Sequence, residues 1–157
     1  MPEIGDSISL FEVMSANGTI FHFPADVVED LLVFVVYRKN DCAPCRVQLN
    51  YLSEDYVVIK AAGAELVALS YPPPEESIIV QEELNLPYRL LCDPEANLLE
   101  QLGAINAEKL HAAKQIHSGL VYPTIFLFEK SGKVRFKLET KRTATQEEFE
   151  SIYTYLG

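Results

Sequence analysis

The stretch Leu31-Leu-Val-Phe-Val-Val-Tyr-Arg-Lys-Asn-Asp-Cys-Ala-Pro-Cys-Arg46 decides how this chain folds. It opens with an unbroken run of seven apolar residues, Leu31 to Tyr37. Such a run is typical of a central strand of a parallel sheet, where both faces are covered. After a short loop, the segment Cys42 to Ala62 carries apolar residues at helical spacing, namely Leu49, Leu52, Tyr56 and Ile59. The stretch therefore predicts a buried strand that runs into a helix, with two cysteines in the helix's first turn.

Strands and helices are predicted to alternate around this unit. Asn17-Gly18 lies between Ile8–Met14 and Thr19–Phe23, and Asn-Gly between two β-prone runs predicts a hairpin. Asp93-Pro94 predicts the start of a short helix, with Asp93 as the N-cap and proline at the first helical position. Thr145 and Glu148 predict a capping box at the start of the last helix. The remaining predicted elements are strands at 65–70, 88–92, 124–128 and 133–138, a helix at 75–84, and a partly helical excursion at 104–122.

The composition indicates one globular domain. The chain has 157 residues, of which 48% are hydrophobic and 23% charged, and no Gly/Ser-rich linker divides it. We therefore expect a single α/β domain over residues 1–157, in which helices flank a central mixed β-sheet. The N-terminal β-hairpin, residues 1–23, is an extension of this core.

The charge balance excludes several partner classes. Thirteen Lys and Arg against 23 Asp and Glu give a formal charge of −10, which disfavours binding to nucleic acid or to an anionic membrane surface. The first ten residues lack a basic stretch followed by an apolar one, and no apolar run approaches the ~20 residues of a membrane helix. These features predict a cytoplasmic protein. In that reducing compartment, two close cysteines are more often catalytic or metal-binding than structural.

The position of the cysteine pair favours redox chemistry. Reactive groups in α/β sheets gather at the carboxyl ends of strands, and a thiol at a helix N-terminus can have its pKa lowered from ~8.5 to roughly 3.5–7.5. Arg38, Lys39 and Arg46 would add to this effect, whereas Asp41 would oppose it. A modest lowering of the pKa is the expected result.

The spacing of the pair suggests how the two thiols work together. Positions three apart on a helix face each other closely enough for a disulfide, and Pro44 is tolerated in the first turn. We expect Cys42, at the outer end, to attack and Cys45, deeper in the helix, to resolve the mixed disulfide. The redox-active Cys42–Cys45 disulfide would then be the only cofactor.

Two alternatives to redox chemistry are a zinc site and a pair of structural thiols. Zinc prefers four ligands, and the chain offers only Cys92, His22, His111 and His117 besides the pair, without a second C-x-x-C. We therefore expect no metal. Cys92 lies in an apolar strand and is best interpreted as a small buried hydrophobe. His111 and His117 more simply belong to a solvated helix face.

At this point the chain resembles the thioredoxin-like superfamily, and within it the branch of alkyl hydroperoxide reductase and thiol-specific antioxidant (AhpC/TSA, peroxiredoxin-like) proteins. The likeness rests on the strand before Cys42-Ala-Pro-Cys-Arg46 and on Gly63-Ala-Glu-Leu-Val-Ala-Leu-Ser70, Leu90-Leu-Cys-Asp-Pro-Glu95 and Tyr122-Pro-Thr-Ile-Phe-Leu-Phe128. The resemblance implies a thioredoxin-like fold. It also implies that Pro123 is cis and packs beside the cysteines, that Thr124 opens the supporting strand, and that the Tyr122 backbone pairs with bound substrate.

The chain departs from the standard members of these families. Peroxiredoxins carry the pattern P-x₃-[TS]-x₂-C. Alignment on Cys45 puts Arg38 and Cys42 at the Pro and Thr/Ser positions, and alignment on Cys42 puts Val35 and Lys39 there. Thioredoxins have Trp before the first cysteine and a buried Asp on the preceding strand, where this chain has Asp41 and Val36. The hydroxyl that would contact a peroxide is therefore absent from this motif.

Three functions remain open from the sequence. The first is a thiol–disulfide oxidoreductase that acts on protein or small-molecule disulfides and is reset by an external thiol reductant. The second is a thiol-dependent peroxidase in which one cysteine is oxidised to a sulfenic acid and the other resolves it. The third is a redox-sensing or interaction module without turnover.

Overall fold

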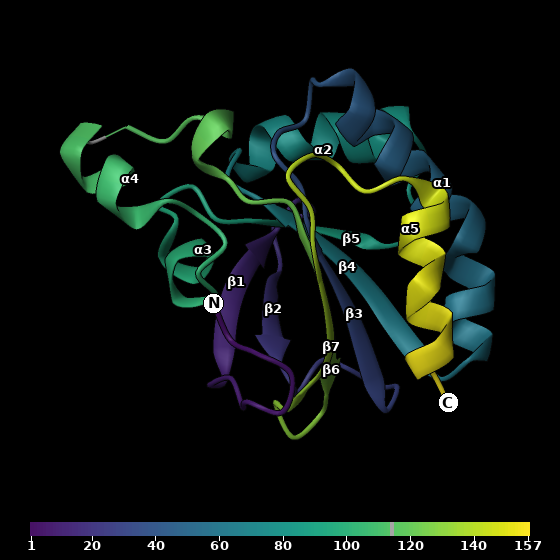
Figure 1. Ribbon diagram of the computed structural model, residues 1–157. Helices are drawn as coiled ribbons and strands as arrows, with labels where there is room; N and C mark the ends of the chain where they lie inside the picture. Colours follow the sequence, from purple (N-terminus) through teal and green to yellow (C-terminus); the bar gives the residue numbers. More distant parts are fainter. Residues whose placement is uncertain (114) are drawn as a thin grey trace.

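A computed structural model describes residues 1–113 and 115–157, and one mixed sheet forms its centre (Figure 1). The strand order is β2-β1-β5-β4-β3-β6-β7. β3, β4 and β5 run parallel to one another, and the remaining neighbours pair antiparallel, as predicted for a mixed sheet. The strands are β1 (Phe11–Ser15), β2 (Ile20–Phe23), β3 (Leu31–Val36), β4 (Ala64–Ser70), β5 (Arg89–Cys92), β6 (Thr124–Glu129) and β7 (Val134–Glu139).

Helices cover both faces of this sheet. The face that carries Leu31, Val33 and Val35 packs against α1, α2, α5 and η2. The opposite face, with Phe34 and Val36, packs against α3 and α4 and against aromatic side chains of the β1–β2 hairpin. The helices are α1 (Ala43–Ala61), α2 (Pro74–Glu83), α3 (Asn97–Gln101), α4 (Ala107–Ala113), η1 (Ser118–Leu120), α5 (Gln146–Glu150) and η2 (Ser151–Tyr155).

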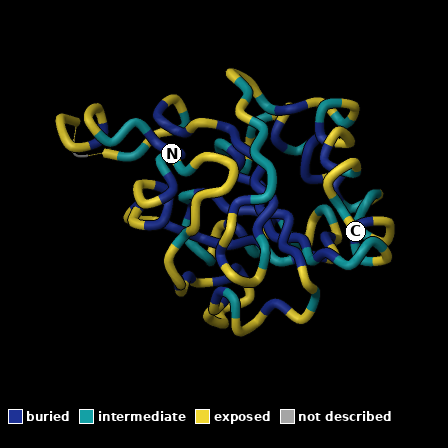
Figure 2. Tube along the Cα trace, turned by 60° about the horizontal axis from the view of Figure 1, so that its bottom comes forward, coloured by how far each residue is buried: buried dark blue, intermediate teal, exposed yellow. Residues whose placement is uncertain are grey.

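The burial of β3 confirms the prediction from its apolar run. Every residue from Leu31 to Tyr37 is at most 4% exposed, because alternate side chains enter the two separate cores. The buried part of the trace lies in the interior of the molecule, and exposed segments lie mainly at its periphery (Figure 2). The predicted Asn17-Gly18 hairpin is also present, and β1 joins it to the sheet by pairing with β5.

The helix predicted after Asp93-Pro94 begins later than expected, so the assignment of Asp93 as its N-cap is wrong. Residues 93–96 form a turn, in which the Ala96 N–H donates to the Asp93 carbonyl at 2.9 Å. Ala96, in the left-handed region with φ of 61°, precedes α3. The Asp93 carboxylate still accepts the Leu99 N–H at 2.7 Å, so it satisfies an amide of the first helical turn from outside the helix.

The last third of the chain agrees with the remaining predictions. The excursion at 104–122 holds α4 and η1, with residue 114 outside the described part. Thr145 and Glu148 form the predicted capping box at the start of α5. In the part of the chain that the structure covers, no helix combines the length and apolar character needed to cross a bilayer.

Candidate active site

Cys42 and Cys45 occupy the start of α1, close to the carboxyl end of β3. Cys42 is the N-cap of α1, and its sulfur accepts the backbone N–H of Cys45 at 3.1 Å. The two cysteines form a disulfide with their Cα atoms 5.2 Å apart. Pro44 lies in the first turn, which contains no acidic residue. The predicted geometry of the pair is therefore present.

The two sulfurs differ in their access to solvent. Cys45 has no exposed surface, whereas Cys42 is half-buried. Cys42 also lines a cavity of about 300 Å³ together with Pro44, Arg38 and Lys39. A molecule that enters this cavity meets Cys42 first.

The other wall of the cavity comes from distant parts of the sequence. Ser118 of η1 and Arg142 and Thr143, in the segment between β7 and α5, complete the lining. The hydroxyl oxygen of Thr143 lies 4.0 Å from the sulfur of Cys45. Nothing in the sequence indicates these three residues as site residues, apart from the pair of basic residues at Lys141-Arg142.

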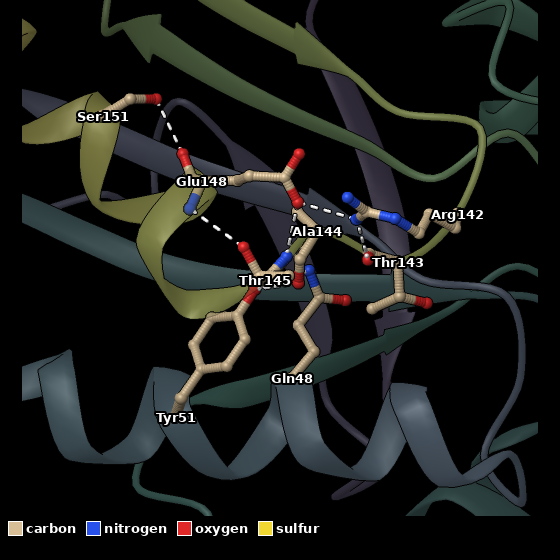
Figure 3. A network of polar contacts seen from close by, with 8 residues as sticks. All are labelled: Gln48, Tyr51, Arg142, Thr143, Ala144, Thr145, Glu148 and Ser151. Carbon is tan, nitrogen blue, oxygen red and sulfur yellow. Dashed lines mark hydrogen bonds and ion pairs between the residues drawn. The ribbon is translucent and has the colours of Figure 1, made fainter.

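A polar network holds the segment that carries Arg142 and Thr143 (Figure 3). The Arg142 Nη1 group donates to the Glu148 carboxylate at 2.7 Å and to the Thr143 carbonyl at 3.0 Å. Glu148 also accepts the Thr145 N–H at 2.9 Å. The Arg142 guanidinium, followed by the Thr145 N–H, lowers the pKa of Glu148 to about 2.

The helix that carries the cysteines anchors this segment from below (Figure 3). The Tyr51 hydroxyl of α1 donates to the Ala144 carbonyl at 2.7 Å and accepts from Gln48 Nε2 at 3.2 Å. Burial raises the pKa of Tyr51 to about 12, so this hydroxyl keeps its proton. The helix that begins at the cysteines is therefore hydrogen-bonded directly to the segment that carries Thr143.

The loop from Arg38 to Asp41 is held by polar contacts with neighbouring elements. The Tyr37 hydroxyl donates to Asn40 Oδ1 at 2.8 Å, and Asn40 Nδ2 donates to Ser77 Oγ at 3.1 Å. Desolvation raises the pKa of Tyr37 well above its usual range. Arg38 Nη2 donates to the Lys141 carbonyl at 3.0 Å, which connects this loop to the segment opposite.

Only some of the residues predicted to support the cysteine pair line the cavity beside it. Arg38 and Pro44 line the cavity, whereas Arg46 does not and pairs instead with Glu83 of α2 at 3.1 Å. Tyr122, Pro123 and Thr124 are also absent from the lining. Cys92, which is 1% exposed, is a buried free thiol as expected. In the described residues no group of three or more His, Cys, Asp or Glu side chains could hold a metal ion.

The expectation of a cis Pro123 is wrong. Among the described residues, the cis peptide bond is Phe23–Pro24, and the bond before Pro123 is trans. The Tyr122 N–H donates to the Ala104 carbonyl at 2.8 Å, and the Thr124 hydroxyl donates to the Tyr122 carbonyl at 2.8 Å. The Tyr122 N–H is therefore already bonded within the chain, and pairing of the Tyr122 carbonyl with a bound substrate stays a prediction.

A curated relative matches part of the chain. Peroxiredoxin bcp1 of Schizosaccharomyces pombe is 28% identical over 102 residues, which cover 65% of this chain and 52% of that protein. The chain thus spans about half the length of this curated relative.

Solved structures with low sequence identity share the fold. The peroxidoxin BcpB of Mycobacterium tuberculosis matches with a TM-score of 0.85 and 17% identity, over 99% of this chain and 97% of that one. A mutant of Xylella fastidiosa PrxQ matches with a TM-score of 0.82 and 12% identity, over 98% and 95% of the two chains. The expected thioredoxin-like fold is confirmed. The family model described as AhpC/TSA family matches residues 4–137, and the chain therefore belongs to the AhpC/TSA family.

Proposed function

We propose that the chain is a thiol-dependent peroxidase in which Cys42 reacts with the peroxide and Cys45 resolves the product. The observation that carries the proposal is the position of the pair. A half-buried Cys42 faces a cavity and is disulfide-bonded to a fully buried Cys45, in a member of the AhpC/TSA family.

Several groups would favour the reactive thiolate of Cys42. The Cys45 N–H already points at the Cys42 sulfur, and the N-terminus of the 19-residue helix α1 contributes partial positive charge. Arg38 and Lys39 bring positive charge to the same cavity. The negative charge on sulfur would therefore be stabilised before a peroxide arrives.

The reaction runs in two chemical steps followed by reduction. The Cys42 thiolate attacks the terminal peroxide oxygen, the O–O bond breaks, and the alcohol leaves after it takes up a proton. Cys42 is then a sulfenic acid. The Cys45 thiolate attacks the Cys42 sulfur, and hydroxide leaves as water after protonation, which forms the disulfide. An external dithiol supplies two electrons to restore both thiols, so no further cofactor is needed. A reducing cytoplasm is the compartment that supplies such thiols.

The Thr143 hydroxyl supports the peroxidase over the other functions. The motif around the cysteines lacks the Thr or Ser of standard peroxiredoxins, because Lys39 stands in its place when the chain is aligned on Cys42, the cysteine proposed to react. Thr143 brings a hydroxyl to the cavity from another segment, 4.0 Å from the Cys45 sulfur. It could donate a hydrogen bond to a peroxide oxygen or to a sulfur.

Thiol–disulfide exchange is the second candidate, and the ready formation of the disulfide favours it. Cys42 is the N-cap of α1 and Cys45 lies in its first turn, and the two are bonded while the helix is intact. In this reaction the Cys42 thiolate would attack a substrate disulfide and release one thiolate. Cys45 would then attack the Cys42 sulfur, release the second thiolate and close the pair.

The proposal is tested by peroxide consumption and by trapping of intermediates. The reduced chain is mixed with hydrogen peroxide, and the same is done with Cys42→Ser and Cys45→Ser. We expect consumption well above that of a free thiol for the intact chain and none for Cys42→Ser. Cys45→Ser should accumulate a Cys42 sulfenic acid, which dimedone labels and mass spectrometry locates.

The same experiment separates the alternatives. Dimedone on Cys45 in Cys42→Ser, with retained turnover, would reverse the two roles. Peroxide consumption no faster than that of free thiol, together with rapid reduction of an oxidised dithiol substrate, would favour thiol–disulfide exchange. Failure of both reactions would leave a module without turnover.

A further inference from the structure

We propose that the cavity beside Cys42 selects a small organic hydroperoxide that carries a carboxylate. This inference rests on the proposed peroxidase activity and adds the chemical class of the substrate. It follows from the charges that line the cavity, from its volume and from the contrast with the rest of the molecule.

Three cations from two separate segments line the cavity, and no carboxylate is among the described lining residues. They are Arg38 and Lys39, which precede α1, and Arg142, which precedes α5. The chain as a whole carries a formal charge of −10, so its general surface repels anions. The cavity is therefore a local positive site on an acidic protein.

The cations differ in how far carboxylates of the chain already neutralise them. Arg142 contacts Glu148 at 2.7 Å, and Lys39 lies 3.6 Å from Asp41, an exposed pair that solvent screens. Arg38 contacts no carboxylate among the described residues, and it donates only to the Lys141 carbonyl, at 3.0 Å. The positive charge of the Arg38 guanidinium is therefore the least neutralised of the three. Its planar set of N–H donors also suits a carboxylate.

The volume limits the size of the ligand. About 300 Å³ lies at the lower end of small-molecule sites, which hold roughly 300–1,000 Å³. Pro44 and the Cys42 sulfur contribute apolar surface, so a short carbon chain can lie between the cations and the reactive sulfur. A hydroperoxide at one end of such a chain and a carboxylate at the other match this arrangement.

The test compares hydroperoxyhexanoic acid with its methyl ester, which share the carbon chain and the peroxide but differ in charge. For each form of the protein, kcat/KM for the acid is divided by kcat/KM for the ester. This quotient is then divided by the ratio of the rate constants with which a free dithiol reacts with the acid and with the ester. The result, the corrected ratio, no longer contains the intrinsic reactivity of the two compounds. We expect the intact chain to prefer the acid by about tenfold, as charge-assisted hydrogen bonds allow, and the preference to fall as salt rises.

Variants of the cations complete the test. Arg38→Gln should bring the corrected ratio close to one, and Arg38→Lys should keep part of the preference. Because the ratio is taken within one variant, a change in Cys42 reactivity cancels. Lys130→Gln removes an exposed cation that does not line the cavity and should leave the ratio unchanged.

The outcomes distinguish failure of this inference from failure of the peroxidase itself. A corrected ratio of one in the intact chain, with hydrogen peroxide still consumed, would overturn the carboxylate preference alone. An acid preference that survives in Arg38→Gln would overturn the role of Arg38. No consumption of acid, ester or hydrogen peroxide would overturn both proposals.

Discussion

The hydroxyl of Thr143 lies 4.0 Å from the sulfur of Cys45, although 98 positions separate the two residues in sequence. The contact arises because the segment between β7 and α5 crosses the start of α1. Tyr51 on α1 holds that segment through the Ala144 carbonyl. The redox pair and a hydroxyl from the far end of the chain thus form one site.

Thr143→Val should lower peroxide turnover by about tenfold, the lower end of what a hydrogen bond to a charged group contributes. Valine keeps the shape of threonine but cannot donate to a sulfur or peroxide oxygen. Thr143→Ser, which keeps the hydroxyl, is the matched control and should retain most of the activity. Equal kcat/KM for the valine variant and the intact chain would remove Thr143 from the mechanism.

Tyr51→Phe should destabilise the chain by about 1–1.5 kcal/mol, because the buried Ala144 carbonyl loses its donor. The Thr143 segment should also lose its fixed position, so turnover should fall together with stability. Urea unfolding measures the first effect and peroxide consumption the second. Tyr71→Phe, at a half-buried tyrosine outside this network, serves as the comparison. Unchanged stability and turnover in Tyr51→Phe would contradict the anchoring role.

The contribution of Glu148 to stability should depend on pH. Its folded-state pKa is lowered to about 2 by Arg142 and Thr145, below the value of about 4.3 expected in the unfolded chain. A lowered folded-state pKa gives stability that is fully present above the unfolded pKa and is lost as pH falls towards about 2. The difference in free energy of unfolding between the intact chain and Glu148→Gln should therefore shrink from pH ~6 to ~3.

The exposed neighbour Glu147 provides the control for that measurement. Glu147→Gln should differ little from the intact chain across the same pH range. Urea unfolding at several pH values gives both differences. A Glu148→Gln difference that stays constant with pH would show that the Arg142 contact does not stabilise the folded chain.

Cys92 should not take part in turnover. It is 1% exposed, and burial raises its pKa to about 11, so its thiolate is scarce at neutral pH. Brief treatment of the reduced native chain with iodoacetamide near pH ~8 should label Cys42 and spare Cys92. Cys92→Ala should keep full peroxide turnover. Rapid labelling of Cys92, or loss of turnover in the variant, would assign it a second resolving role.

The local features of this protein follow from short stretches of sequence. The apolar run Leu31 to Tyr37, the Asn17-Gly18 turn, the Thr145 capping box and the cysteine pair at a helix start are all present as predicted. Each depends on neighbours within a few residues, through side-chain periodicity, backbone conformation or capping. Asp93 is the exception, because a turn at 93–96 moves the helix start while its carboxylate still reaches the helix.

Only the tertiary structure decided what surrounds the cysteines. Pairing of β6 with β3 and of β7 with β6 brings the segment after β7 to the start of α1, and with it Arg142 and Thr143. Docking of α2 draws Arg46 to Glu83 and away from the cavity, and backbone bonds engage Tyr122. These contacts join residues far apart in the chain, and no local pattern encodes them. The sequence by itself thus determined the reactive pair, and long-range packing determined which cysteine is accessible and which charges face it.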